Sequence, residues 1–107
     1  HVMDLAQGHV AALDWLISNE KFSGVEAFNL GTGNAVSVFA IVKAFEQAIN
    51  KTIPFEVSPR RTGDLAAFWA NARKANKELN WQASRSLEQM MKDTWRWQSN
   101  NPNGYLV

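Results

Sequence analysis

The sequence predicts an α/β fold of the α+β kind, with three to four helices and two or three short strands. Apolar residues recur at helical spacing in several segments of the chain. Two shorter segments are rich in β-branched and aromatic residues and are bounded by turn residues. Because two short strands do not form a stable sheet alone, we expect all 107 residues to form one region of a larger protein.

The first predicted helix runs from about Leu5 to Asn19, with Asp4 as its N-cap. Its predicted apolar stripe comprises Leu5, His9, Leu13, Leu16 and Ile17. Turn residues at Ser23–Gly24 separate this helix from a predicted short strand, Val25–Leu30, which ends at Gly31-Thr32-Gly33.

A second predicted helix is capped by Ser37 and ends near Asn50. Its apolar stripe comprises Val38, Ile41, Val42, Phe45 and Ile49. Alternating apolar residues predict a second strand at Ile53–Val57. The stretch SPRRTGDLAAFWAN, residues 58–71, follows, and Ala67–Ala70 within it is predicted to be extended.

Two further helices are predicted in the last third of the chain. A short polar helix is capped by Asn71 and runs to Leu79. Ser86 and Gln89 have the spacing of a capping box and open the last helix. Its predicted apolar face comprises Leu87, Met90, Met91, Thr94 and Trp95. Residues 100–102, which include a proline, end this helix and a tail to residue 107 follows.

The composition excludes several classes of function. A formal net charge of +1 argues against a large nucleic-acid interface, which needs a concentrated basic face. The five tryptophans could stack on bases, but packing is the more economical explanation. There is no cysteine for a disulfide or a thiolate zinc site, and two histidines offer too few ligands for another metal site. No apolar run reaches the ~18–20 residues that cross a bilayer, and we expect a cytoplasmic protein.

A glycine pair and isolated carboxylates are weak candidates for a site. Gly31-Thr32-Gly33 lies where a dinucleotide fingerprint would lie, but that pattern needs a glycine or a close substitute at position 36, where Val36 stands. A tight turn is the favoured interpretation. Glu46 and Glu56 are isolated carboxylates, which favours solvated surface over an acid–base pair.

The segment RRTGD is the strongest candidate. The guanidinium of Arg60 or Arg61 is a planar fork suited to phosphate oxygens, and Asp64 can accept hydrogen bonds from a sugar diol. Gly63 allows the backbone to turn sharply between them. This combination suits a nucleotide-sugar, although an arginine–aspartate ion pair on the surface explains the same residues equally well.

Five segments together resemble the C-terminal part of the UDP-glucose 4-epimerases, a family of extended short-chain dehydrogenases/reductases. They are HVMDLAQGHVAAL, FNLGTGNAVSV, SPRRTGDLAAFWAN, ANKELNW and DTWRWQSNNPNGY. The resemblance covers nearly the whole chain and implies that residues 1–107 are a single C-terminal UDP-sugar-binding region. In the family an N-terminal Rossmann domain holds NAD and carries a catalytic Tyr-x-x-x-Lys pair. Neither is found here, since Tyr105 is the only tyrosine, so the chain is expected to hold no catalytic or cofactor-binding residue and to be inactive alone.

The resemblance also implies roles for four residues. By motif match, Arg61 corresponds to an arginine that contacts the UDP diphosphate, and Asp64 to a carboxylate on the ribose. Val38 corresponds to an apolar contact in the UDP pocket, and Phe68 to an aromatic residue near the sugar. Since Phe68 is bulky, UDP-glucose and UDP-galactose are the favoured ligands.

Three alternatives and an expectation about assembly remain. An epimerase for another UDP-sugar, such as a UDP-N-acetylhexosamine, is one alternative, and a non-catalytic nucleotide-sugar-binding or interaction module is another. A tryptophan-rich nucleic-acid binder comes third. The whole protein is expected to be a homodimer, as family members commonly are, and the isolated chain is expected to self-associate through exposed apolar surface.

Overall fold

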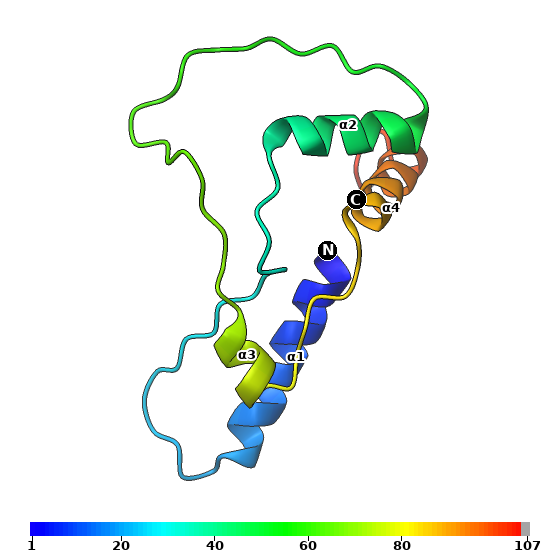
Figure 1. Ribbon diagram of the computed structural model, residues 1–107. Helices are drawn as coiled ribbons and strands as arrows, with labels where there is room; N and C mark the ends of the chain where they lie inside the picture. Colours follow the sequence, from blue (N-terminus) through cyan, green and yellow to red (C-terminus); the bar gives the residue numbers. More distant parts are fainter. Residues whose placement is uncertain (106–107) are drawn as a thin grey trace. The chain divides into compact units, whose positions relative to one another are not determined.

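Four α-helices form in the part of the chain that the computed structural model describes, residues 1–105 (Figure 1). They are α1 (Val2–Ser18), α2 (Val38–Ile49), α3 (Arg73–Glu78) and α4 (Leu87–Asn100). The first of two compact units comprises His1–Ala35 and Ala67–Arg85 and contains α1 and α3. The second comprises Val36–Ala66 and the segment from Ser86 onward, with α2 and α4. The expected single region stays a prediction, and residues 106 and 107 of the expected tail lie outside the described residues.

The two predicted strands are wrong, because no residue from 1 to 105 forms a β-strand. Val25–Leu30 in the first unit and Ile53–Val57 in the second are both irregular, and so is Ala67–Ala70. A strand exists only where its backbone N–H and C=O groups pair with a neighbouring strand. These short segments have no such partner within the described residues. The predicted number of helices is confirmed, whereas the β component is absent.

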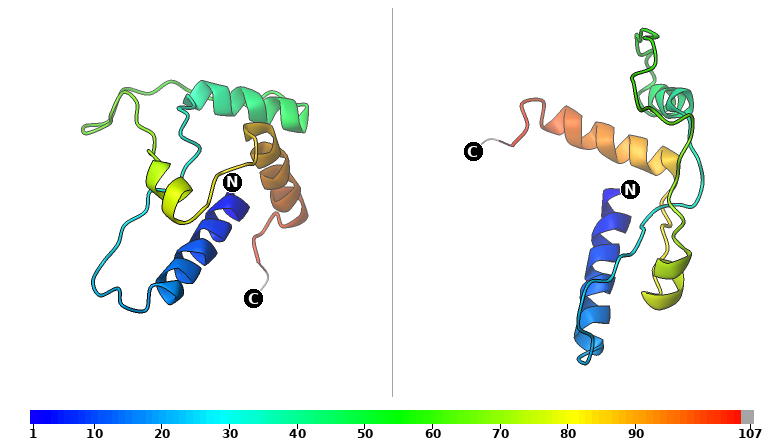
Figure 2. Two further views of the ribbon diagram at one scale, coloured as in Figure 1. Left: turned by 60° about the horizontal axis from the view of Figure 1, so that its bottom comes forward. Right: turned by 90° about the vertical axis from the view of Figure 1, so that its left-hand side faces the viewer.

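The core of the first unit lies between α1 and α3, which run beside each other (Figure 2). Its buried apolar residues are Ala72, Ala75, Leu79 and Trp81, and Ala11, Ala12, Trp15, Phe28, Leu30 and Ala83 pack against them. Gly8 of α1 permits this packing, because a Cβ at that position would lie 2.6 Å from Cδ1 of Leu30. A larger residue at this position would require the Leu30 side chain to move away from α1.

Aromatic contacts hold the segment after α1 against the helix. The Trp15 ring meets Phe22 and Phe28 edge-on, at centroid distances of 5.2 and 5.4 Å. The Lys74 ammonium of α3 lies 4.8 Å from the Phe28 ring centroid, donates to the Ala27 carbonyl at 3.1 Å and pairs with the Glu26 carboxylate. The irregular segment is thus fixed by side chains rather than by strand pairing.

The predicted apolar stripe of α1 is exposed within the described residues. All five of its residues are exposed or only half-buried; Leu13 and Ile17, for example, are 58% and 71% exposed. The helix instead turns Asp4, Gly8, Ala11, Ala12 and Trp15 toward the core. Helical spacing identifies a period, but it does not choose between two apolar stripes on one helix. The choice is made by distant residues, through the pairing of Asp4 with Arg85 and the close approach of Trp81 to Gly8.

Asp4 is the one charged side chain that is fully buried among residues 1–105, with 2% of its surface exposed. Its carboxylate accepts hydrogen bonds from the Arg85 backbone N–H at 3.1 Å and from the Ser84 hydroxyl at 3.4 Å, and it pairs with the Arg85 guanidinium. The Trp81 indole N–H donates to the Asp4 carbonyl at 2.8 Å. Burial raises the pKa of Asp4, but the hydrogen bonds and positive charge of Arg85 outweigh it and hold the pKa below the ordinary value of 3.8.

Asp4 is therefore not the N-cap of α1, as the sequence predicted. The helix begins earlier, and the His1 side chain accepts a hydrogen bond from the Met3 N–H at 3.0 Å. The predicted caps of the second unit are confirmed. Ser37 accepts from the Ala40 N–H at 3.1 Å, and Ser86 accepts from the Gln89 N–H at 3.2 Å.

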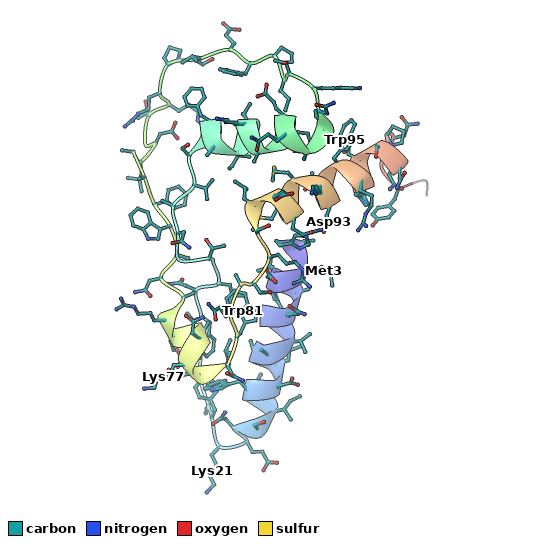
Figure 3. The ribbon with its side chains drawn as sticks, turned by 45° about the vertical axis from the view of Figure 1, so that its right-hand side comes forward. Met3, Lys21, Lys77, Trp81, Asp93 and Trp95 are labelled. Carbon is teal, nitrogen blue, oxygen red and sulfur yellow. The ribbon has the colours of Figure 1, made fainter. Side chains whose placement is uncertain are left out.

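In the second unit α2 packs across α4. Phe45 of α2 meets Trp95 of α4 edge-on at a centroid distance of 6.2 Å, and Figure 3 shows Trp95 on the side of α4 that faces α2. The predicted helix faces are partly covered here, since Val42, Phe45, Met90 and Met91 are half-buried. No described residue of this unit is fully buried, so this unit has little core of its own.

From the ion pair between Asp4 and Arg85 we predict how a substitution of Asp4 changes the free energy of unfolding. The variant Asp4→Asn leaves Arg85 without its counter-charge, and we expect the free energy of unfolding to fall by about 2–4 kcal/mol near pH 7. A carboxyl group whose pKa is lowered by folding contributes stability above its unfolded pKa of about 3.9, and loses it as pH falls through the lower folded value. Urea unfolding at pH 7 and at pH 2.5 measures both effects.

The matched control is Asp14→Asn on the same helix, where the carboxylate is exposed. It should change the unfolding free energy by less than about 0.5 kcal/mol. The penalty of Asp4→Asn should shrink at pH 2.5, because that pH lies below the unfolded pKa, where the stability that the lowered folded pKa contributes is being lost. An equal penalty at both pH values would contradict the assigned role of the charge.

Candidate functional site

Arg61 and Asp64 are brought together by a tight turn. The Asp64 N–H donates to the Arg61 carbonyl at 3.2 Å, which closes a four-residue β-turn. Gly63 has φ +90°, the value that a type II turn needs at its third position and that only glycine adopts readily. The sequence thus prescribes this turn locally, through one glycine.

The Asp64 carboxylate also stabilises the turn, through hydrogen bonds from Arg61. Its Oδ2 accepts from the Arg61 backbone N–H at 3.2 Å and from the Arg61 Nε–H at 3.3 Å. The Arg61 side chain is 86% exposed and the Asp64 side chain 38%, so this pair contributes little to stability. Only Nε of the guanidinium is used, and its two Nη groups remain available for an anionic ligand.

Val38 and Phe68 both lie outside this turn in the sequence, and both are exposed. Val38 is the first residue of α2 in the second unit, next to the Ser37 cap, and is 75% exposed. Phe68 belongs to the irregular segment of the first unit and is 82% exposed. Both present apolar surface to solvent, as residues that line a ligand would do before the ligand binds. The roles given to these two residues stay predictions.

The first unit contains a pocket that was not predicted from the sequence. It has a volume of about 330 Å³ and is lined by Gly31, Thr32, Gly33, Trp69, Ala70, Asn71, Ala72, Arg73, Asn76 and Gln82. Two of its lining residues, Gly31 and Ala70, approach each other closely, because a Cβ on Gly31 would lie 2.9 Å from the Cβ of Ala70. The paired glycines are the signal that could have indicated it. None of the four predicted ligand contacts lines this pocket.

The glycine pair does not have the surroundings of a dinucleotide site. No strand precedes Gly31 within the described residues, and α2 begins only at Val38. A dinucleotide fingerprint needs a strand before it and a helix opening directly on it. The segment is a turn, with Thr32 and Asn34 joined by mutual hydrogen bonds.

Residues 1–105 meet neither the requirements of a metal site nor those of a membrane-spanning helix. No three His, Cys, Asp or Glu side chains gather where they could hold a metal ion. None of the four helices is long and apolar enough to cross a membrane.

The chain is similar in sequence to UDP-glucose 4-epimerases from several organisms. The chain is 58% identical over 104 residues to UDP-glucose 4-epimerase of Erwinia amylovora, 50% over 105 residues to that of Bacillus subtilis, and 51% over 105 residues to that of Drosophila melanogaster. Each alignment covers 97–98% of this chain and 30% of the relative. No family model matches the chain.

A solved structure agrees with these relatives. UDP-glucose 4-epimerase from Bifidobacterium longum, crystallised with NAD+ and UDP, superimposes with a TM-score of 0.86 at 46% sequence identity. The superposition covers 98% of this chain and 30% of that protein. The chain therefore spans about 30% of the length of the proteins it matches.

From the exposure of the segment around the turn we predict where a protease cuts the chain first. Limited digestion with trypsin should cut first after Lys51, Arg60 or Arg61, because this segment is irregular and exposed. Mass spectrometry of the first fragments measures the cut. Arg85 is the internal control, since its side chain is occupied by Asp4, and a first cut after Arg85 would contradict the described packing.

Proposed function

Because this chain is homologous to about 30% of the length of UDP-glucose 4-epimerases, we propose that it is the UDP-sugar-binding part of such an enzyme. The whole protein would interconvert UDP-galactose and UDP-glucose, and this chain would supply half of the clamp that holds the substrate. The observation that carries the proposal is the preformed turn of Arg61 and Asp64, which places a cationic fork beside a carboxylate.

Each end of the turn suits one part of UDP. The Nη groups of Arg61 can donate two parallel hydrogen bonds to diphosphate oxygens, which is the geometry that guanidinium favours. The Asp64 carboxylate cannot bind an anion, but it can accept hydrogen bonds from the two hydroxyls of the ribose. When UDP binds, the weak Nε contact between the two side chains need not break, so binding costs little rearrangement.

Two apolar residues, Val38 and Phe68, would complete the proposed UDP-sugar site. Val38, at the exposed N-terminus of α2, would pack against the nucleotide. Phe68, 82% exposed, would lie near the sugar and restrict its size. A bulky residue there favours UDP-glucose and UDP-galactose over N-acetylated sugars. An epimerase for a UDP-N-acetylhexosamine is the alternative within the family, and substrate assays on the whole protein separate the two.

NAD does not fit the described residues. The only glycine pair near a helix lacks both the strand and the adjacent helix of a dinucleotide site. Tyr105 is the only tyrosine and has no lysine after it, so no Tyr-x-x-x-Lys pair is present. The hydride chemistry that NAD supplies would therefore belong to the remainder of the enzyme, and this chain would bind and orient UDP.

The first prediction of this proposal concerns UDP affinity. We expect UDP to quench or enhance tryptophan fluorescence saturably, with the 58%-exposed Trp69 as a reporter close in sequence to the turn. Arg61→Ala removes a charged donor, so binding should weaken by about 1.5–3 kcal/mol, or roughly 10- to 150-fold.

Arg60→Ala is the matched control, because it removes the same charge from the neighbouring position. It should weaken UDP binding by less than about threefold, the effect of a solvated charge. Equal losses in both variants would show that the segment attracts UDP only by net charge. An unchanged affinity in Arg61→Ala would remove Arg61 from the clamp.

The second prediction concerns catalysis. The isolated chain should show no interconversion of UDP-galactose and UDP-glucose, even with added NAD, because it has no acid–base pair beside the predicted sugar position. A coupled assay for UDP-glucose measures this. Turnover that co-purifies with the chain through several columns would contradict the proposal, whereas UDP binding without turnover agrees with it.

A further inference from the structure

We propose that Asn103 is a modification site, at which the neighbouring backbone and water convert the side-chain amide to a carboxylate. Asn103 is followed by Gly104, and no other asparagine of the chain precedes a glycine. The nucleophile in this reaction is the backbone nitrogen of the residue after the asparagine. Glycine leaves that nitrogen unhindered, because it has no Cβ.

Residues 101–104 form a turn directly after α4. The Gly104 N–H donates to the Asn101 carbonyl at 3.0 Å. Asparagine, proline and glycine stand at the first, second and fourth positions, where a type I turn favours them. Gly104 has φ +76°, and a Cβ built on it would meet no atom within 4 Å beyond its chain neighbours. The space beside the nucleophilic residue is therefore open.

The amide that would be attacked is also accessible. The Asn103 side chain is exposed and makes no hydrogen bond to any of residues 1–105. The Asn101 amide, by contrast, donates to the Trp97 carbonyl at 2.9 Å. The Asn103 side chain is thus free to turn its Cγ toward the Gly104 nitrogen.

The conversion takes two steps. In the first, the Gly104 nitrogen gives up its proton to base and its electron pair attacks Cγ of Asn103. The bond from Cγ to the side-chain nitrogen breaks, that nitrogen takes up a proton and leaves as ammonia, and a succinimide ring remains. In the second, water adds to a ring carbonyl and a bond from that carbon to the ring nitrogen breaks. Opening at Cγ gives aspartate and opening at the main-chain carbon gives isoaspartate, with water as the only co-reactant.

The turn controls the rate of this conversion. While the turn is closed, the Gly104 N–H is held by the Asn101 carbonyl and is not available to base. The reaction therefore follows the fraction of molecules in which the turn is open. One hydrogen bond of ordinary strength lowers that fraction roughly 2- to 12-fold, and an unfolded chain should react faster by the same factor.

The product differs from the original chain in charge and in backbone. A carboxylate at position 103 cancels the formal net charge of +1, and a chain near zero net charge associates more readily. Tyr105 meets the Trp97 ring edge-on at a centroid distance of 5.8 Å. Isoaspartate lengthens the backbone between α4 and Tyr105, so this contact should be displaced.

The test follows solvent oxygen into the chain. The 107-residue chain is incubated at mildly alkaline pH in water enriched in heavy oxygen, once folded and once in urea. Trypsin cleavage after Arg96 releases a fragment that contains Asn100, Asn101 and Asn103, and tandem mass spectrometry locates the label. In the folded chain the label should appear at residue 103 alone, and in urea it should appear there roughly 2- to 12-fold faster.

Two asparagines of the same fragment are internal references. Asn101 precedes Pro102, which has no N–H to react. Asn100 precedes an N–H that donates to the Trp97 carbonyl at 2.9 Å. Label at Asn100 before residue 103 in the folded chain would overturn the proposal, and equal rates at residue 103 in the folded chain and in urea would overturn the control by the turn.

Asn103→Gln is the matched variant, because it keeps the amide but moves it one methylene further from the Gly104 nitrogen. Isoelectric focusing should show a growing acidic species in the original chain and a single species in the variant. An acidic species that forms at the same rate in Asn103→Gln would arise elsewhere and would contradict the assignment.

Discussion

The first unit depends on the burial of one carboxylate. Asp4 sits at the start of α1 and is joined to residues about eighty positions later by the hydrogen bonds and charge of Ser84 and Arg85. Since an unpaired buried charge costs several kcal/mol, α1 can bury Asp4 only where Arg85 is present. The same register places Trp81 over Gly8 and its indole N–H on the Asp4 carbonyl. The ion pair thus selects which side of α1 faces the core.

That selection explains why much of the chain is apolar and yet exposed. Small residues of α1 fill the contact with Trp81, and the larger Val, Leu and Ile side chains are left outside. In the second unit no described side chain is fully buried, and Phe45 and Trp95 make one edge-to-face contact at a centroid distance of 6.2 Å. Hydrophobic stabilisation scales with the apolar area removed from water. Both units therefore leave apolar surface exposed, and its burial by a covering partner would add stabilisation.

The features predicted correctly from the sequence are those encoded by neighbouring residues. Ser37 and Ser86 cap their helices because a hydroxyl needs only a backbone N–H three positions on, and the 61–64 turn follows from Gly63. The strands at Val25–Leu30 and Ile53–Val57 failed because a strand needs a distant partner, which no local pattern supplies. The side of α1 that is buried could not be predicted for the same reason, since it depends on Arg85 and Trp81.

In the candidate site, too, some features are determined by neighbouring residues and others by residues distant in the sequence. A turn that holds Arg61 and Asp64 together can form in the isolated chain, because every contact that fixes it lies within four residues. Val38 is fixed as the first residue of α2, whereas Phe68 lies in an irregular segment, and a ligand contact from Phe68 needs that segment to be held.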